Sequence, residues 1–145
     1  MVDMKEAISK LIEANSEIFE NAFLKRFPTD EELSKAESIL GLKLPEEYVW
    51  FLKTYGHGGF FFEFLGYGLN GAALFANKTL KEREAGLPQE LLVIEDCDEF
   101  VECIDTISGE IVSWSRFDKA GIVKIADNFY EHFVDKLENA IDNWE

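Results

Sequence analysis

The amino-acid sequence predicts an α+β fold, in which a mainly antiparallel β-sheet is backed by helices. Three observations support this prediction. Capped segments with apolar residues at helical spacing open the chain, a long segment of the same kind closes it, and shorter apolar runs typical of strands lie between them. The sequence shows no internal repeat, low-complexity tract or linker. We therefore expect residues 1–145 to form a single domain, with N-terminal helices and a long C-terminal helix.

Capping signals predict the first two helices. Asp3, followed three residues later by Glu6, matches a capping box, and apolar residues at helical spacing follow it. Thr29 and Glu32 repeat the same signature, and Gly41 supplies a stop for the helix that begins there. Both helices therefore have a predicted start, and the second also has a predicted end.

Two further helices are predicted downstream. In LPEEYVWFLKTYG, Pro45 suits the first helical position and Gly56 ends the pattern. The last helix opens near Asp127 and keeps its apolar residues on one face as far as Trp144. On its other side lie five carboxylates at steps of three and four, a pattern typical of a solvated outer face. These are Glu131, Asp135, Glu138, Asp142 and Glu145.

Five segments between the helices have strand character. The run FFFEFL is rich in aromatic residues, and the segments after it contain β-branched residues bounded by turn signals. The predicted strands are Phe60–Leu65, Leu91–Glu95, an antiparallel hairpin of Phe100–Asp105 with Glu110–Ser115, and Ile122–Ile125. We assign no secondary structure to residues 72–89.

Charge is the most unusual bulk property of the chain. The 145 residues include 47% apolar residues and carry a formal net charge of −15. From Met1 to Arg83 there are 13 acidic and 10 basic residues, which give a net charge of −3. From Glu84 to Glu145 there are 16 acidic and 4 basic residues, which give a net charge of −12. Such a surface disfavours direct binding of nucleic acid or anionic membranes. It suits a basic partner, or it serves only to keep an aromatic-rich domain soluble.

The cellular compartment of the protein is predicted from the lack of membrane-spanning and signal segments in the sequence. It has no apolar run long enough to span a membrane and no basic segment leading into an apolar signal core. Cys97 and Cys103 do not form the disulfide framework of a small secreted domain, so we expect both to be reduced. We therefore expect a cytoplasmic protein.

One motif points to a nucleotide, but the surrounding pattern does not support it. Gly66, Gly68 and Gly71 match G-x-G-x-x-G, the dinucleotide fingerprint. That site requires parallel βαβ units, whereas the hairpin signal is antiparallel and three helices open the chain. We therefore expect the glycines to allow turns or close backbone approach at a strand exit.

The sequence offers little support for catalysis or metal binding. A cysteine nucleophile would need a nearby histidine, and the chain has only His57, in a glycine-rich turn, and His132, which we expect at a polar rim of the last helix. The run EDCDE lacks the alternating ligands and glycine of a calcium loop, and no four-ligand zinc set occurs. We predict no enzyme activity, no cofactor and no metal.

A series of motifs follows the predicted elements in a specific order. The first is TDEELSKAESILGLKLPEEYVWFLKTYGHGG, from Thr29 to Gly59, and the others are FLGYG, LLVIED and FYEHF. These motifs, which span Thr29 to Trp144, resemble the SUKH superfamily, the Smi/Knr-type domain best known from bacterial toxin-immunity proteins. Within it they are similar to the YobK-like immunity proteins. The match is weakest over residues 72–89.

The resemblance implies an α+β domain whose exposed sheet face and loops bind a cognate toxin and block it. Many toxins bound by this superfamily are nucleases, and some relatives are regulatory interaction modules. We therefore predict an immunity protein, or antitoxin, that neutralises a secreted toxin domain with a basic nuclease surface. The alternative is a cytosolic regulatory or scaffolding module that has no toxin partner.

We expect the partner-binding surface to combine carboxylates with aromatic anchors. The run EDCDE would form an acidic rim at a strand end and steer a basic partner, although a solvated turn explains it equally well. Tyr67 and Trp114 lie near strand ends beside glycine or serine, where an exposed aromatic ring can act as a hot spot. The predicted partner-binding residues are Tyr67, Asn70, Glu95, Asp96, Asp98, Glu99 and Trp114.

Overall fold

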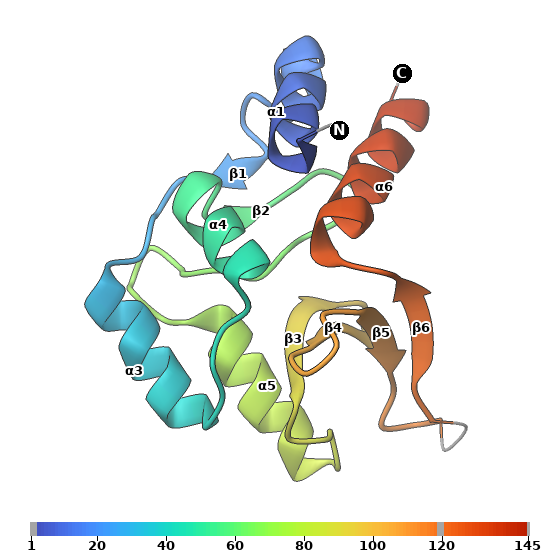
Figure 1. Ribbon diagram of the computed structural model, residues 1–145. Coiled ribbons are helices and arrows are strands. Elements are labelled where there is room, and N and C mark those ends of the chain that lie inside the picture. Colours follow the sequence, from blue (N-terminus) through green and yellow to red (C-terminus); the bar gives the residue numbers. More distant parts are fainter. Residues whose placement is uncertain (1–2, 119–120, 145) are drawn as a thin grey trace.

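The fold is described from a computed structural model, which covers residues 3–118 and 121–144 (Figure 1). Its helices and strands follow in an α+β order. They are α1 (Met4–Ala14), α2 (Ser16–Phe19), β1 (Phe23–Leu24), α3 (Asp30–Leu40), α4 (Glu46–Thr54), β2 (His57–Gly58), α5 (Leu74–Glu84), β3 (Leu91–Asp96), β4 (Val101–Asp105), β5 (Ile111–Trp114), β6 (Val123–Ala126) and α6 (Phe129–Asp142).

Two antiparallel sheets are present, and the larger one confirms the predicted hairpin. Its four strands lie in the order β3-β4-β5-β6, while β1 and β2 form a small separate pair. Strands β4 and β5 pair from Val101 with Trp114 to Ile104 with Ile111. Every ladder of the larger sheet is antiparallel, so the sheet provides no context for a dinucleotide fingerprint.

The helix starts largely follow the capping signals. Thr29 and Glu32 form the predicted capping box, and Gly41 ends α3 in a left-handed conformation with φ of +68°. At α1 the cap is simpler, because the Asp3 carboxylate accepts a hydrogen bond from the amide of Lys5. Pro45 is the N-cap of α4, one position before the predicted one.

The predicted strand Phe60–Leu65 is wrong. Gly58 and Phe64 exchange backbone hydrogen bonds of 2.9 and 3.0 Å, so the chain between them turns back on itself instead of extending. Gly58 and Gly59 have positive φ angles, as does Phe61. The buried apolar run is real, but the glycine pair before it permits a tight loop that the apolar pattern alone does not distinguish from a strand.

Residues 72–89, which had no prediction, contain α5. This helix lies against β3 and shields its edge, since the Thr79 hydroxyl accepts a hydrogen bond from the amide of Val93. Arg116, which follows β5, contacts Glu82 on the same helix. The apolar pattern of α5 is weak because its buried face includes Thr79 and Glu82, so helical periodicity was not evident from the sequence.

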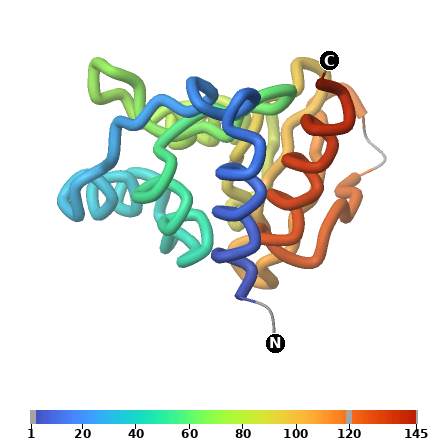
Figure 2. The backbone as a smooth tube through the Cα atoms, turned by 90° about the horizontal axis from the view of Figure 1, so that it is seen from above, coloured from blue at the N-terminus to red at the C-terminus, as the bar shows by residue number. Residues whose placement is uncertain are grey.

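Aromatic rings form the centre of the core. Phe51, Phe64, Phe129 and Phe133 are fully buried and contact one another, mostly edge to face. Helix α6 packs beside α1, as Figure 2 shows, and also contacts α4 and β6. The carboxylates at 131, 135, 138 and 142 are exposed as predicted, whereas Glu145 lies outside the described residues.

Candidate protein-binding site

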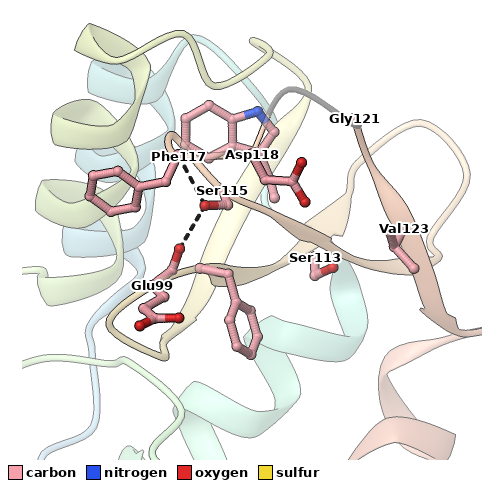
Figure 3. A pocket seen from close by; sticks show the side chains of 9 residues that line it. Glu99, Ser113, Ser115, Phe117, Asp118, Gly121 and Val123 are labelled. Atoms are coloured by element: carbon pink, nitrogen blue, oxygen red, sulfur yellow. Dashed lines mark hydrogen bonds between the residues drawn. The ribbon is translucent and has the colours of Figure 1, made fainter.

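A hollow of about 680 Å³ opens at one end of the larger sheet, where the turn before β4 and the segment after β5 lie beside β5 and β6 (Figure 3). Its lining combines aromatic rings, hydroxyl groups and carboxylates. We call it the Trp114 hollow, and it is lined by Glu99, Phe100, Ser113, Trp114, Ser115, Phe117, Asp118, Gly121 and Val123.

The sheet and one serine position the rim of the Trp114 hollow. Trp114 ends β5 directly opposite Val101, the first residue of β4. The Ser115 hydroxyl donates a 2.6 Å hydrogen bond to the carbonyl of Glu99 and accepts a 3.1 Å bond from the amide of Phe117 (Figure 3). The first bond joins the β3–β4 turn to the segment after β5, and the second orders that segment itself.

The surface of the hollow suits contact with another protein. Phe117 is 75% exposed and Phe100 is 40% exposed, while Trp114 is partly buried against the core. Exposed aromatic rings surrounded by polar groups are typical of interface hot spots. A smaller hollow of about 140 Å³ adjoins this one and shares Glu99, Phe100 and Phe117 with it.

The structure brings several of the predicted site residues together. Glu99 and Trp114 both line the Trp114 hollow, and Asp98 lines the adjoining one. Asp96 is also exposed. Its carboxylate lies 3.3 Å from the ammonium of Lys78 and accepts a hydrogen bond from the amide of Asp98. Strand β3 thus ends in an acidic turn beside aromatic rings.

The expectation that Tyr67 is exposed is wrong. Its side chain is only 2% exposed, its hydroxyl donates to the carbonyl of Glu32, and the guanidinium of Arg26 lies 5.2 Å from the centre of its ring. Burial raises the pKa of Tyr67 to about 12. Tertiary packing therefore covers a ring that the flanking glycines suggested would be free.

Glu95 is also buried, contrary to its predicted place on the acidic rim. It accepts a 2.7 Å hydrogen bond from the amide of Glu63, and its other oxygen lies 3.1 Å from the ammonium of Lys136 on α6. Burial raises the pKa of this carboxyl above its ordinary value. Strand alternation explains the difference, because Glu95 faces α6 whereas Asp96 points away from it.

Asn70 is exposed but lies in a different part of the molecule. It belongs to the loop before α5, whose residues Gly71, Ala72 and Ala73 line a hollow beside α3, whereas the Trp114 hollow is lined by other segments. Its side chain accepts a hydrogen bond from the amide of Ala72.

Close backbone approach explains one glycine of the G-x-G-x-x-G match. A Cβ atom at Gly66 would overlap the carbonyl of Gly56, so only glycine fits this position.

A buried ion-pair network links the sheet to α6. Lys136 lies 3.1 Å from carboxylate oxygens of both Glu95 and Glu102, and His132 lies 3.0 Å from Glu102. Burial would raise the pKa of Glu102, yet the hydrogen bond from His132 and the charge of Lys136 lower it to about 2. His132 therefore lies in the interior and not at the polar rim expected for it.

The same network contains the only group of potential metal ligands among the residues that the structure describes. Glu95, Cys97 and Glu102 each place one ligand atom within 4.8 Å of the others. Their chemistry does not fit a metal well, because the ammonium of Lys136 already pairs with both carboxylates. Burial and the neighbouring carboxylates also raise the pKa of the Cys97 thiol to about 12, whereas a metal requires the thiolate.

The two thiols are free and poorly suited to nucleophilic chemistry. Cys97 and Cys103 do not form a disulfide, as expected. Burial raises the pKa of Cys103 well above its ordinary value, as it does that of Cys97. At neutral pH both side chains are therefore thiols, which are weak nucleophiles compared with thiolates.

Sequence reasoning missed two aromatic residues of the Trp114 hollow. Phe100 and Phe117 were grouped with the other phenylalanines, most of which are expected in a core. For Phe117 a local signal existed, since it lies between Arg116 and Asp118 directly after a strand. A lone aromatic residue in such a polar turn is often exposed. Phe100 offered no comparable signal, because it adjoins the buried strand β4.

Two further findings bear on what kind of protein this is. Among the described residues, none of the helices combines the length and the apolar character that crossing a bilayer requires. The family model SUKH_5, described as SMI1-KNR4 cell-wall, matches residues 4–138. This match covers most of the chain, from the start of α1 into α6. The chain therefore belongs to the SUKH (SMI1-KNR4) family.

Proposed function

We propose that this protein is an immunity protein, a single domain over residues 1–145 that binds and neutralises a cognate secreted toxin in the cytoplasm. The Trp114 hollow is the proposed contact surface, and the protein performs no chemistry of its own. The observation that carries this proposal is the combination of SUKH family membership with exposed aromatic rings and carboxylates at one end of the sheet.

The charge of the chain supports a basic toxin, such as a nuclease. Nucleases must attract phosphates, so their clefts are basic. The segment from Glu84 to Glu145, which builds the Trp114 hollow, has 16 acidic and 4 basic residues. Complementary fields of this kind raise the association rate toward roughly 10⁸ M⁻¹s⁻¹ at low salt. Asp96, Asp98 and Glu99 are the proposed steering groups, and direct contact of this acidic protein with nucleic acid or membrane is disfavoured.

The aromatic rings would lower the rate at which the complex with the toxin dissociates. Trp114 ends a strand that pairs with β4, and its side chain packs partly against the core, so its ring is already ordered before a partner binds. Ordered aromatic side chains lose little conformational entropy on binding. Phe100 and Phe117 lie on the same rim and would be desolvated together with it. Asn70, in its separate loop, would then make only a peripheral contact.

The test is co-expression with the C-terminal domain of the protein encoded by the neighbouring gene. We expect the host to survive only when both chains are made, and the two chains to purify as a one-to-one complex. A neighbour that is not toxic and does not bind would contradict the proposal and favour the alternative, a regulatory or scaffolding module that binds a cellular protein reversibly.

Variants at the hollow separate steering from anchoring. Asp98→Asn combined with Glu99→Gln should lower the association rate about threefold to tenfold at low salt, with little effect at high salt. Trp114→Ala should instead raise the dissociation rate about thirtyfold, as expected for a hot-spot residue. Stopped-flow and surface plasmon resonance would measure both rates.

The matched control for the charge change is Glu131→Gln with Asp135→Asn. Both carboxylates are exposed on α6. Their substitution removes the same amount of charge as the change at positions 98 and 99, but at a site outside the hollow. If the α6 pair lowered the association rate as much as the pair at positions 98 and 99, the net charge alone would be responsible, and the local steering role of Asp98 and Glu99 would be wrong.

A further inference from the structure

A second group of exposed aromatic side chains lies outside the Trp114 hollow. Phe60 and Phe61 meet with ring centroids 4.7 Å apart, and Phe60 meets Trp144 at 5.6 Å, both nearly edge to face. Phe61 is 61% exposed and Trp144 is 43% exposed. We call these three residues the Phe61 patch. It joins the loop after β2 to the residues that follow α6, and none of its members lines the Trp114 hollow.

The backbone at Phe61 is strained. Its φ angle is +65°, a left-handed conformation that is unfavourable for a bulky aromatic residue and natural for glycine. The side chain does not offset this cost by burial, because most of it is exposed to solvent. A glycine would fit this position with less strain and would expose less apolar surface. Strain of this kind, held at an exposed aromatic residue, indicates a role other than stability.

Hydrogen bonds on both sides hold the strained segment in place. The amide of Gly59 donates a 3.0 Å bond to the carbonyl of Ala22, and the amide of Glu63 donates a 2.7 Å bond to the carboxylate of Glu95. The latter carboxylate is itself part of the buried network with Lys136. The Phe61 patch is therefore presented on an ordered loop, which reduces the entropy that binding would cost.

The two segments that build the patch are acidic. The two segments that build it contain no lysine or arginine between Tyr55 and Asn77 or between Leu137 and Glu145. Glu63 and Asp142, each two residues away from a patch member in the sequence, are exposed, and the carboxylate of Glu63 also lies 3.1 Å from Nε2 of His57. Aromatic faces and carboxylates together attract cations, because the negative face of a ring and a negative charge act in the same direction.

We propose that the Phe61 patch is a second protein-binding site, which takes an arginine- or lysine-bearing segment of a partner protein. A guanidinium is the best-suited group, since it can stack on an aromatic ring while it pairs with a carboxylate. The site does not depend on the partner being a toxin, because it follows from the geometry and charge of the patch itself.

The test uses a capped tri-arginine peptide and the full chain at low salt. In ¹H–¹⁵N spectra we expect the largest shifts at the amides of Phe60 and Phe61 and at the indole of Trp144, and we expect salt to reduce them. Phe61→Gly and Trp144→Ala should each weaken binding about fivefold. Phe27→Ser, which removes a ring that is 46% exposed and belongs to neither proposed binding surface, is the matched control and should leave peptide affinity unchanged.

Thermal melts of the same variants separate binding from folding. Phe61→Gly should melt at the same temperature as the parent protein or higher, since glycine relieves the strain. Peptide affinity equal in the parent and in both patch variants would overturn the proposal, as would peptide shifts spread evenly over the acidic surface. A clear drop in melting temperature for Phe61→Gly would also overturn it, because Phe61 would then be a structural residue. None of these results depends on the co-expression experiment.

Discussion

At the scale of single residues, the most consequential arrangement is the buried network of Glu95, Glu102, His132 and Lys136. Burial would lower the pKa of Lys136, yet the two carboxylates raise it above its ordinary value. An ammonium shared by two buried carboxylates ties β3 and β4 to α6. Removing one partner of such a buried pair leaves an uncompensated charge, which is far more costly than replacing the whole pair.

The pKa of Glu102 predicts how stability depends on pH. Its folded value of about 2 lies below the ordinary value of 4.5, so its contribution is complete above pH 4.5 and is lost as the pH falls toward 2. The difference corresponds to about 3 kcal/mol in the free energy of unfolding. Glu102→Gln should therefore destabilise the protein by about that amount at pH 7, and urea titrations from pH 7 to 3 should show the gap to the parent closing.

Glu95→Gln is the informative control. The pKa of Glu95 is raised by burial and by the charge of Glu102, so its ionisation disfavours the folded state above its raised pKa. A glutamine can still accept the hydrogen bond from the amide of Glu63. We expect Glu95→Gln to cost much less than Glu102→Gln at pH 7. Equal losses would show that the two carboxylates are equivalent and that the assigned directions of their pKa shifts are wrong.

At the scale of elements, helix ends are determined locally and loops are not. Thr29 and Glu32 form a capping box, in which each side chain accepts from the backbone amide of the other residue, and the same Glu32 pairs with Arg26. The sequence was sufficient to predict this end of α3. The strand expected at Phe60–Leu65 was wrong because it depended on backbone angles at glycines, which apolar patterning does not report.

The cap of α3 gives a prediction for one element. Thr29→Ala should lower the free energy of unfolding by about 1 kcal/mol, since the amide of Glu32 loses its acceptor. Thr29→Ser retains the hydroxyl and should be nearly neutral. Chemical denaturation of the three proteins would measure this, and an equal loss for alanine and serine would contradict the role of the cap.

At the scale of the whole molecule, the aromatic core connects elements that are distant in the sequence. Phe133 on α6 contacts Phe23 of β1, Phe51 and Tyr55 at the end of α4, and Phe62 in the loop after β2. One ring therefore couples the N-terminal helices, the loops and the terminal helix, and these parts are expected to unfold together.

Phe133→Ala tests this coupling. Loss of a fully buried ring should lower the free energy of unfolding by about 3–5 kcal/mol. Phe133→Leu retains most of the volume and should lose considerably less. Circular dichroism and tryptophan fluorescence, which report on helices and on local packing, should show one common transition in each variant. Separate transitions would mean that the chain contains independently folding parts.

Only part of the candidate site could be predicted from the sequence. Asp98, Glu99 and Trp114 lie where turn and strand patterns placed them. The exposure of Phe100 and Phe117, and the burial of Tyr67, could not be predicted, because each depends on which other segments cover the ring. A sequence pattern reports neighbours along the chain, whereas exposure is decided by neighbours in space.

The sequence by itself determined the α+β class, the caps of the main helices, the β4–β5 hairpin, the acidic second half and the family resemblance. These features depend on residues within a few positions of each other or on composition. The tertiary structure alone decided that Glu95 joins Lys136 in the interior while Asp98 and Glu99 remain exposed. It also decided that Phe61 is held in a strained, exposed conformation, because contacts between residues distant in the sequence fix burial and backbone geometry.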